Sequence, residues 1–145
     1  MKFVVQRVSN ASVEVNSKIV GEIEKGFLVL VGIKIADFMV SKLAKLRIFE
    51  DEAGKMNLSI KDVKGKLLLV SQFTLYANCK GGNRPDFVNA AKPEYAKELY
   101  EYVVQKCKQE GIEVQTGIFR EEMKVRLLND GPVTIIMDSS EIMNK

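Results

Sequence analysis

Two short segments of the sequence contain residue types that could carry out chemistry. The first, Ser71-Gln72-Phe73-Thr74, places two hydroxyls, an amide and an aromatic ring in consecutive positions directly after the hydrophobic run Leu67-Leu68-Leu69-Val70. Polar groups at the end of a buried strand are well placed to line a cleft. A purely structural strand end explains the same composition, so this segment alone does not decide between a site and a scaffold.

The second segment is Asn129-Asp130-Gly131-Pro132. As a plain hairpin turn between two strands it needs no function. A cis X-Pro bond is also open to it: such bonds make up roughly 5 to 6% of X-Pro bonds and are held in place by their surroundings. A cis bond between Gly131 and Pro132 would aim the neighbouring carbonyl oxygens rigidly in one direction. Both interpretations stay open on the residues alone.

The sequence contains no histidine, which removes the commonest general base near neutral pH. Ser-His-Asp triads, Cys-His dyads and HExxH zinc sites are therefore excluded. Gly54-Lys55-Met56 lacks the upstream glycine and the Ser or Thr of a phosphate-binding loop, no GxGxxG opens a helix, and no serine lies between glycines as in a nucleophile elbow. Any catalysis must proceed without imidazole.

Three further features have ordinary structural interpretations. Glu50-Asp51-Glu52 fits a solvated surface turn better than a metal site, and no metal or cofactor is expected. The loop Lys80-Gly81-Gly82-Asn83-Arg84 could bind phosphate through backbone N–H groups and its two cations, or it is an ordinary mobile connection. Cys79 and Cys107 form no CxxC pair and are expected to be packing residues, which favours a reducing compartment.

Length and composition predict one globular domain over residues 1–145. The chain has 46% hydrophobic and 28% charged residues, enough apolar surface for an independent core. The longest apolar run, Phe27 to Ile33, is too short to cross a bilayer, and no signal peptide is recognised. We therefore expect a cytoplasmic protein without a membrane partner. The net charge of +3 is mild, so any RNA contact must come from a local patch.

The hydrophobic pattern predicts a mixed α/β fold with largely antiparallel sheets and two main helices. The helices are expected over 36–49 and from Pro93 to a stop at Gly111, the latter with a stripe of Tyr95, Leu99, Val103 and Cys107. The strands are expected within 2–35, including a strand buried on both faces at 27–33, and over 66–76, 112–115, 123–128 and 133–137.

An ordered set of segments makes the sequence resemble the D-aminoacyl-tRNA deacylases. The resemblance rests on Ser71-Gln72-Phe73-Thr74-Leu75, Asn129-Asp130-Gly131-Pro132-Val133-Thr134, and Val5-Gln6-Arg7-Val8 with Ala11-Ser12-Val13. Further matches are Arg47-Ile48-Phe49, Gly54-Lys55-Met56-Asn57, Arg84-Pro85 with Phe87, and Thr116-Gly117 with Phe119 and Met123. The stretch 34–45 is shorter than is usual for the family. Asp86 and Arg120 also depart from its pattern, because a serine often follows Arg-Pro and a small residue is common at the position of Arg120.

The resemblance implies a homodimeric enzyme with the fold of this family and without a cofactor. It would hydrolyse the ester that joins a D-amino acid to the 3′ end of tRNA, would also act on mischarged glycyl-tRNA, and would spare L-aminoacyl-tRNA. By the same resemblance the catalytic residues would be Ser71, Gln72, Phe73 and Thr74, and the substrate-binding residues Arg7, Met123, Gly131 and Pro132. The Gly131-Pro132 bond would be cis and reach into the other subunit's pocket, with Arg7 holding it in place.

The chemistry of an activated ester leaves two mechanisms open. Backbone N–H groups around Ser71 to Thr74 could stabilise the tetrahedral oxyanion while the 2′-OH of the terminal ribose activates water. Alternatively, Thr74 could be a covalent nucleophile, although no base is visible beside it. Chiral selection is expected from a rigid wall of Gly131 and Pro132 carbonyls that an L side chain would strike. A dimeric RNA-binding module without hydrolysis and a purely structural interaction protein are the competing interpretations.

Overall fold

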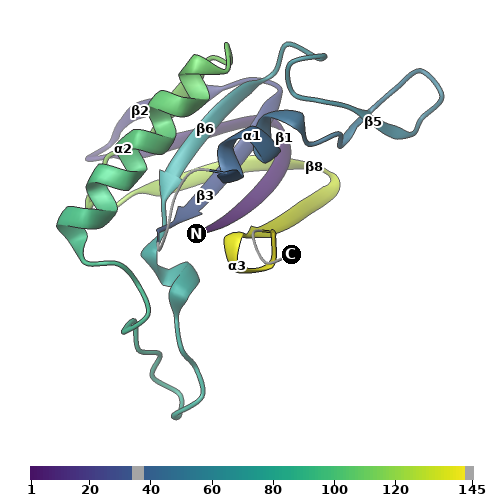
Figure 1. Cartoon of the computed structure of the whole chain (residues 1–145). Coiled ribbons are helices and arrows are strands. Elements are labelled where there is room, and N and C mark those ends of the chain that lie inside the picture. Colours follow the sequence, from purple (N-terminus) through teal and green to yellow (C-terminus); the bar gives the residue numbers. More distant parts are fainter. Residues whose placement is uncertain (34–37, 143–145) are drawn as a thin grey trace.

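The computed structural model of the chain describes residues 1–33 and 38–142 (Figure 1). In chain order its elements are β1 (Lys2–Val15), β2 (Lys18–Ile23), β3 (Gly26–Gly32), α1 (Phe38–Lys45), β4 (Phe49–Glu50), β5 (Met56–Leu58), β6 (Lys66–Ser71), the 3-10 helix η1 (Phe73–Tyr76), α2 (Pro93–Gln109), β7 (Val114–Thr116), β8 (Lys124–Asp138) and α3 (Ser139–Ile142).

Six of the strands form one mixed sheet. Its order is β2-β1-β3-β6-β7. β2 and β3 pair with opposite ends of β1 along one edge, and β8 pairs with β1 along its other edge. β1 is antiparallel to β2, β3 and β8, whereas β3, β6 and β7 run parallel to one another. β4 and β5 make a separate antiparallel pair. The predicted α/β class with a mixed sheet and two main helices is confirmed.

Side chains alternate between two hydrophobic clusters on the two faces of the sheet. In β3, Phe27 and Val29 face the cluster that contains the buried residues of α1 and α2, and Leu28 faces the other. In β6, Leu67 and Leu68 divide in the same way. Both strands are covered on both faces, which is the reason that their apolar runs are continuous. Figure 1 shows α2 lying across the face that it covers.

Several predicted boundaries are wrong. The helix expected over 36–49 is α1, which ends at Lys45, and Phe49 begins β4 instead; Ala36 and Asp37 lie outside the described residues. The strand expected over 66–76 ends at Ser71 because the chain there turns into η1. The strand expected over 112–115 is the shorter β7, shifted toward the C-terminus.

The segment at 129–132 is not a hairpin turn. The strands expected over 123–128 and 133–137 are parts of the single strand β8, and both parts pair with β1. The two strand segments expected near the N-terminus are likewise one continuous strand, β1. This strand pairs with β2, β3 and β8. A hairpin would require the two halves of β8 to pair with each other, and here β1 takes that place.

The predicted stripe of α2 and the role of one cysteine also need correction. The buried face of α2 is formed by Ala96, Tyr100, Val103, Val104 and Cys107, while Tyr95 is half exposed and Leu99 only partly buried. Cys107 is a packing residue as predicted, but Cys79 is exposed.

None of the helices within residues 1–33 and 38–142 has the length and the apolar character that a membrane-spanning helix needs.

Candidate active site

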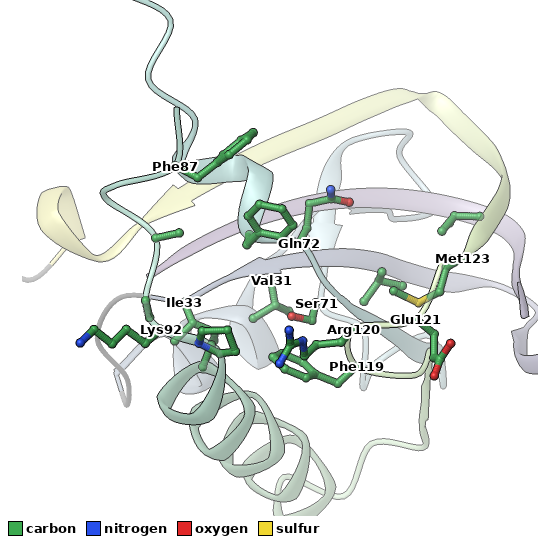
Figure 2. A pocket seen from close by; sticks show the side chains of 17 residues that line it. Val31, Ile33, Ser71, Gln72, Phe87, Lys92, Phe119, Arg120, Glu121 and Met123 are labelled. Carbon is green, nitrogen blue, oxygen red and sulfur yellow. The ribbon is translucent and has the colours of Figure 1, made fainter. Parts of the chain in front are cut away.

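A pocket of about 630 Å³ opens where β6 ends (Figure 2). Its walls come from the ends of β3 and β6, the segment leading into α2 with the first turns of that helix, and the segment between β7 and β8. The described lining residues are Val31, Ile33, Val70, Ser71, Gln72, Phe73, Phe87, Ala90, Ala91, Lys92, Pro93, Ala96, Phe119, Arg120, Glu121, Met123 and Val125. Its size is within the range of about 300 to 1,000 Å³ found for sites that bind small molecules.

The last rung of the β3–β6 pairing fixes the polar segment. Ser71 is paired with Val31, and the Gln72 N–H donates to the Val31 carbonyl oxygen at 2.8 Å. The chain then turns, and the Leu75 N–H donates to the Gln72 carbonyl oxygen at 3.3 Å. A parallel strand is thus followed at once by a 3-10 turn, which brings the polar side chains to the edge of the sheet as expected.

Gly32 lets η1 lie close to the end of β3. A Cβ at this position would stand 3.0 Å from the Leu75 Cβ and 3.2 Å from the Tyr76 ring. Tyr76 is buried, and burial together with the charge of Asp138 raises the pKa of its phenol to about 12. This hydroxyl therefore stays protonated at neutral pH and cannot serve as a base there.

The first backbone N–H groups of η1 are free. Among the residues that the structure describes, neither the Phe73 N–H nor the Thr74 N–H has a hydrogen-bond acceptor, whereas that of Gln72 is bound to Val31. The first N–H groups of any helix lack partners within the helix. Two adjacent donors at the rim of a pocket can bind a carbonyl oxygen or an oxyanion.

The side chains of the polar segment are not equivalent. Phe73 lines the pocket, is 56% exposed, and packs edge-on against Phe87 with 5.0 Å between ring centroids. Thr74 is not among the described lining residues, and its hydroxyl accepts a hydrogen bond from the Gln72 side-chain amide. A neutral amide N–H cannot take a proton from that hydroxyl.

α2 is tied to the same strand from the other side of the pocket. The Tyr100 hydroxyl donates to the Leu69 carbonyl oxygen at 2.7 Å, and burial raises the pKa of this phenol above its usual value.

Met123 lines the pocket beside Gly117, where a Cβ would stand 2.5 Å from the Met123 sulfur. The glycine leaves the space that the methionine side chain fills.

Arg7 holds the second polar segment. Its guanidinium is buried and donates to the Ile48 carbonyl oxygen at 2.7 Å and to the Asp130 carbonyl oxygen at 3.1 Å. The Asn129 side-chain amide donates to the carbonyl oxygens of Arg7 and Val133, both at 2.9 Å. Between the Gln6–Thr134 and Val8–Asn129 pairs, Arg7 alone in β1 faces residues 130–133 of β8. These residues therefore form a bulge that is fastened to β1.

Gly131 and Pro132 lie in this bulge. The peptide bond between them is cis, and both residues are exposed. Gly131 has a φ of 135°, and a Cβ there would stand 2.6 Å from Val133 Cγ2 and 3.1 Å from an Arg7 guanidinium nitrogen. Only glycine fits this position without strain.

The structure brings half of the predicted site residues together in the pocket. Ser71, Gln72, Phe73 and Met123 line it; Thr74, Arg7, Gly131 and Pro132 do not. The pocket also uses Phe87, Phe119, Lys92 and Arg120, none of which was predicted to be a site residue. Both phenylalanines belong to segments that carry the resemblance to the family, and this could have marked them as site residues. No motif in the sequence contains Lys92.

Charge in the pocket is sparse. Its described lining holds three charged residues, Lys92, Arg120 and Glu121, and neither cysteine. No group of three or more Cys, Asp or Glu residues that could hold a metal ion occurs within residues 1–33 and 38–142. What this pocket offers to a ligand is mainly apolar walls, backbone donors, two cations and one carboxylate.

Comparison with known proteins places the chain in a family. Residues 4–138 match the family model described as D-Tyr-tRNA(Tyr) deacylase. The chain belongs to this family. Two curated relatives named D-aminoacyl-tRNA deacylase are 52% identical over 149 residues (Thermosipho melanesiensis; 98% of this chain and 99% of the relative) and 57% identical over 145 residues (Geotalea uraniireducens; 96% and 94%). The predicted family and enzyme class are thus confirmed: the protein is a D-aminoacyl-tRNA deacylase, a hydrolase.

Two solved structures share the fold of this chain. A protein named c-Myc DNA Unwinding Element Binding Protein superposes with a TM-score of 0.87 at 40% sequence identity, covering 96% of this chain and 99% of that one. A probable eukaryotic D-amino acid tRNA deacylase superposes with a TM-score of 0.82 at 17% identity, over 94% of this chain and 98% of the other. The second match shows the fold alone.

The close approach at Gly32 generates a prediction for the deacylase. In Gly32→Ala the new methyl group displaces η1 and the N–H groups of Phe73 and Thr74, because its Cβ meets Leu75 and Tyr76. We expect kcat/KM for D-tyrosyl-tRNA to fall by about 3- to 10-fold, since these contacts require a shift of only a few tenths of an ångström and a misplacement of about 1 Å can cost about 100-fold. Gly81→Ala is the matched control, because nothing lies within 4 Å of a Cβ there. Equal activity of the two variants would show that this approach does not position the site.

Proposed function

We propose that this deacylase hydrolyses the ester between a D-amino acid, or glycine, and the 3′ end of tRNA in the pocket at the end of β6. The observation that carries the proposal is the pair of free N–H groups of Phe73 and Thr74 beside a mainly apolar pocket. An aminoacyl ester is already activated, so hydrolysis chiefly requires stabilisation of the tetrahedral oxyanion and an oriented water.

The backbone donors supply the first requirement. Each preorganised N–H that binds an oxyanion contributes about 10²- to 10³-fold to the rate. Phe73 is the better placed of the two, since it lines the pocket and Thr74 does not. The apolar walls strengthen the interaction, because charge attraction increases where water is excluded.

The substrate itself supplies the second requirement. The terminal ribose carries a free 2′-OH beside the ester, and this hydroxyl can position or activate the water. Glu121 is the one carboxylate among the described lining residues, and Figure 2 shows it pointing away from Ser71 and Phe119. The alternative of Thr74 as nucleophile has less support, because its hydroxyl is engaged by an amide donor and no base is beside it.

Chiral selection uses a second copy of the chain. Gly131 and Pro132 are exposed and do not line the pocket of their own chain, so their carbonyls would act in the pocket of a partner in a homodimer. Two apolar residues of β8 on the same strand, Leu128 and Ile136, are 57% and 69% exposed and would be covered by such a partner. Arg7 would keep the bulge in one conformation through Asp130.

The wall formed by this bulge acts by exclusion. With the ester and amino group fixed, an L side chain would strike the wall, while a D residue presents only a hydrogen to it. The pocket on the other side would accept D side chains broadly. Glycine has no side chain to strike the wall, so glycyl-tRNA would be hydrolysed as well.

The proposed activity is tested with three matched esters. We expect the purified protein to release the amino acid from D-tyrosyl-tRNA and from glycyl-tRNA and to leave L-tyrosyl-tRNA intact, as followed by the loss of labelled amino acid from tRNA. Binding of tRNA without loss of any ester would instead indicate an RNA-binding module. Hydrolysis of the L ester at the rate of the D ester would contradict selection by exclusion.

The oxyanion donors are tested by removing a single N–H. Phe73→Pro removes the N–H and the ring, whereas Phe73→Ala removes the ring alone; proline is tolerated at the first position of a helix. We expect kcat for D-tyrosyl-tRNA to be about 10²- to 10³-fold lower in Phe73→Pro than in Phe73→Ala, with equal thermal stability. If the two variants have the same kcat, the Phe73 N–H plays no part in the reaction.

Action of the bulge in a partner's pocket is tested by mixing two variants. Phe73→Pro retains the bulge but lacks the oxyanion donor, whereas Gly131→Ala retains the pocket, distorts the wall and should hydrolyse the L ester. In a mixed dimer the one active pocket faces an intact wall. After denaturation and joint refolding in equal amounts we expect hydrolysis of L-tyrosyl-tRNA per Gly131→Ala chain to fall by about half, because about half of these chains are then in mixed dimers, while hydrolysis of the D ester per Gly131→Ala chain stays the same. The two variants refolded separately and then mixed are the control. Equal L-ester hydrolysis in the two mixtures would mean that the bulge does not act between chains.

A further inference from the structure

Arg120 is a pocket residue for which the proposed reaction has no use. It lies in the turn Ile118–Glu121, which is closed by a hydrogen bond of 3.3 Å from the Glu121 N–H to the Ile118 carbonyl oxygen. Its φ is 68°, in the left-handed region that favours glycine. A glycine would serve the turn better, so the turn itself gives no reason for an arginine. Strained positions of this kind gather at functional sites.

The side chain of Arg120 is directed across the pocket. In Figure 2 it points toward the start of α2, where Lys92 lies, whereas Glu121 points to the opposite side. Neither Arg120 nor Lys92 makes a side-chain hydrogen bond or ion pair with any of the residues described. The pocket therefore carries two cations that the described chain does not neutralise.

The chemistry of the substrate identifies the anion that fits. In an aminoacyl-tRNA the carboxyl group is esterified and uncharged, and the α-amino group is a cation that an arginine would repel. The nearest negative charge is the phosphate attached to the 5′ oxygen of the same ribose that carries the ester. Guanidinium matches phosphate with two parallel N–H donors, which gives both affinity and orientation.

We infer that Arg120 binds the phosphate of the 3′-terminal nucleotide and thereby orients the ribose that carries the ester. The inference rests on the proposed function for the identity of the ligand, and it makes Arg120 a positioning residue. Lys92 adds positive charge on the same side but lacks the planar pair of donors. An arginine that instead stacks on the adenine base would not depend on the phosphate.

The inference is tested by binding, independently of catalysis. The probes are two non-hydrolysable analogues, 3′-D-tyrosylamino-3′-deoxyadenosine and its 5′-phosphate, whose Kd values are measured by calorimetry. We expect the wild-type protein to bind the phosphate form about 10- to 100-fold more tightly, as for a hydrogen bond between charged groups. Arg120→Gln should remove this preference while its Kd for the form without phosphate stays within about twofold.

Three further variants separate the phosphate contact from a structural role. Lys108→Gln removes an exposed charge at the far end of α2 and should keep the wild-type preference. Arg120→Lys should restore part of it, because lysine binds phosphate as a point charge. Arg120→Gly should lose the preference as Arg120→Gln does, with a melting temperature unchanged or higher by about 2 to 4 °C, since glycine suits the φ of this position.

The outcomes distinguish failure of this inference from failure of the proposed function. A preference for the phosphate form that persists in Arg120→Gln, or that is absent from the wild type, would overturn the phosphate contact. An equal loss of affinity for both analogues would indicate stacking on the base and would overturn it as well. Failure of the wild type to hydrolyse D-tyrosyl-tRNA would refute the proposed function, yet a phosphate preference that depends on Arg120 would still support the contact.

Discussion

The parallel pairing of β3 with β6 is the constraint on which the site depends. It ends at the Val31–Ser71 pair and the hydrogen bond from the Gln72 N–H to the Val31 carbonyl oxygen. Beyond that bond the chain has no strand partner, so it turns into η1 and exposes its first N–H groups. Both strands are buried on both faces, so close packing on two sides holds the position of this end.

In the proposed mechanism, a chain without histidine is a hydrolase because backbone N–H groups stabilise the oxyanion and the substrate's own 2′-OH acts on the water. Backbone N–H groups do not titrate, so donors at the start of η1 keep their character over the whole physiological pH range. The phenol of Tyr76, which belongs to the same 3-10 helix, also stays protonated, because burial raises its pKa to about 12. In the proposed mechanism the group that handles the proton arrives with the tRNA, and free esters without a 2′-OH would be poor substrates.

The sequence predicted those features that depend on local pattern. The continuous apolar runs of β3 and β6 and the proline that begins α2 were placed correctly from short stretches of chain. Of the four residues expected at a cleft after β6, Ser71, Gln72 and Phe73 line the pocket and Thr74 does not. The helical stripe of α2 was misplaced by one position, with Tyr95 assigned in place of Ala96. Two helix faces that are shifted by one residue have almost the same spacing of apolar residues. Only the packing of α2 against the sheet determines which of the two faces is buried.

Features that depend on distant partners could not be predicted. The segment at 129–132 has the composition of a hairpin turn, but Asn129 and Asp130 are bound to Arg7, more than 120 positions away in the chain. The pocket likewise joins the end of β6 to Lys92 and Arg120 from other parts of the chain. The sequence distinguished Arg120 only as a departure from the family pattern. The direction of its side chain depends on how the turn Ile118–Glu121 packs beside β6 and α2, which the sequence does not show.

The two polar segments are separate in one chain but mechanically linked through β1. This strand pairs with β3, which carries the pocket, and with β8, which carries the bulge. Arg7 lies where both pairings run side by side, and its guanidinium spans from Ile48 to Asp130. In a two-fold dimer, β1 of each chain would therefore fix the position of two features: the pocket of its own chain, through β3, and the bulge that enters the partner's pocket, through β8. Because a strand paired on both edges is stiff, the gap left for a substrate would vary little, and selection by exclusion needs a gap that does not widen.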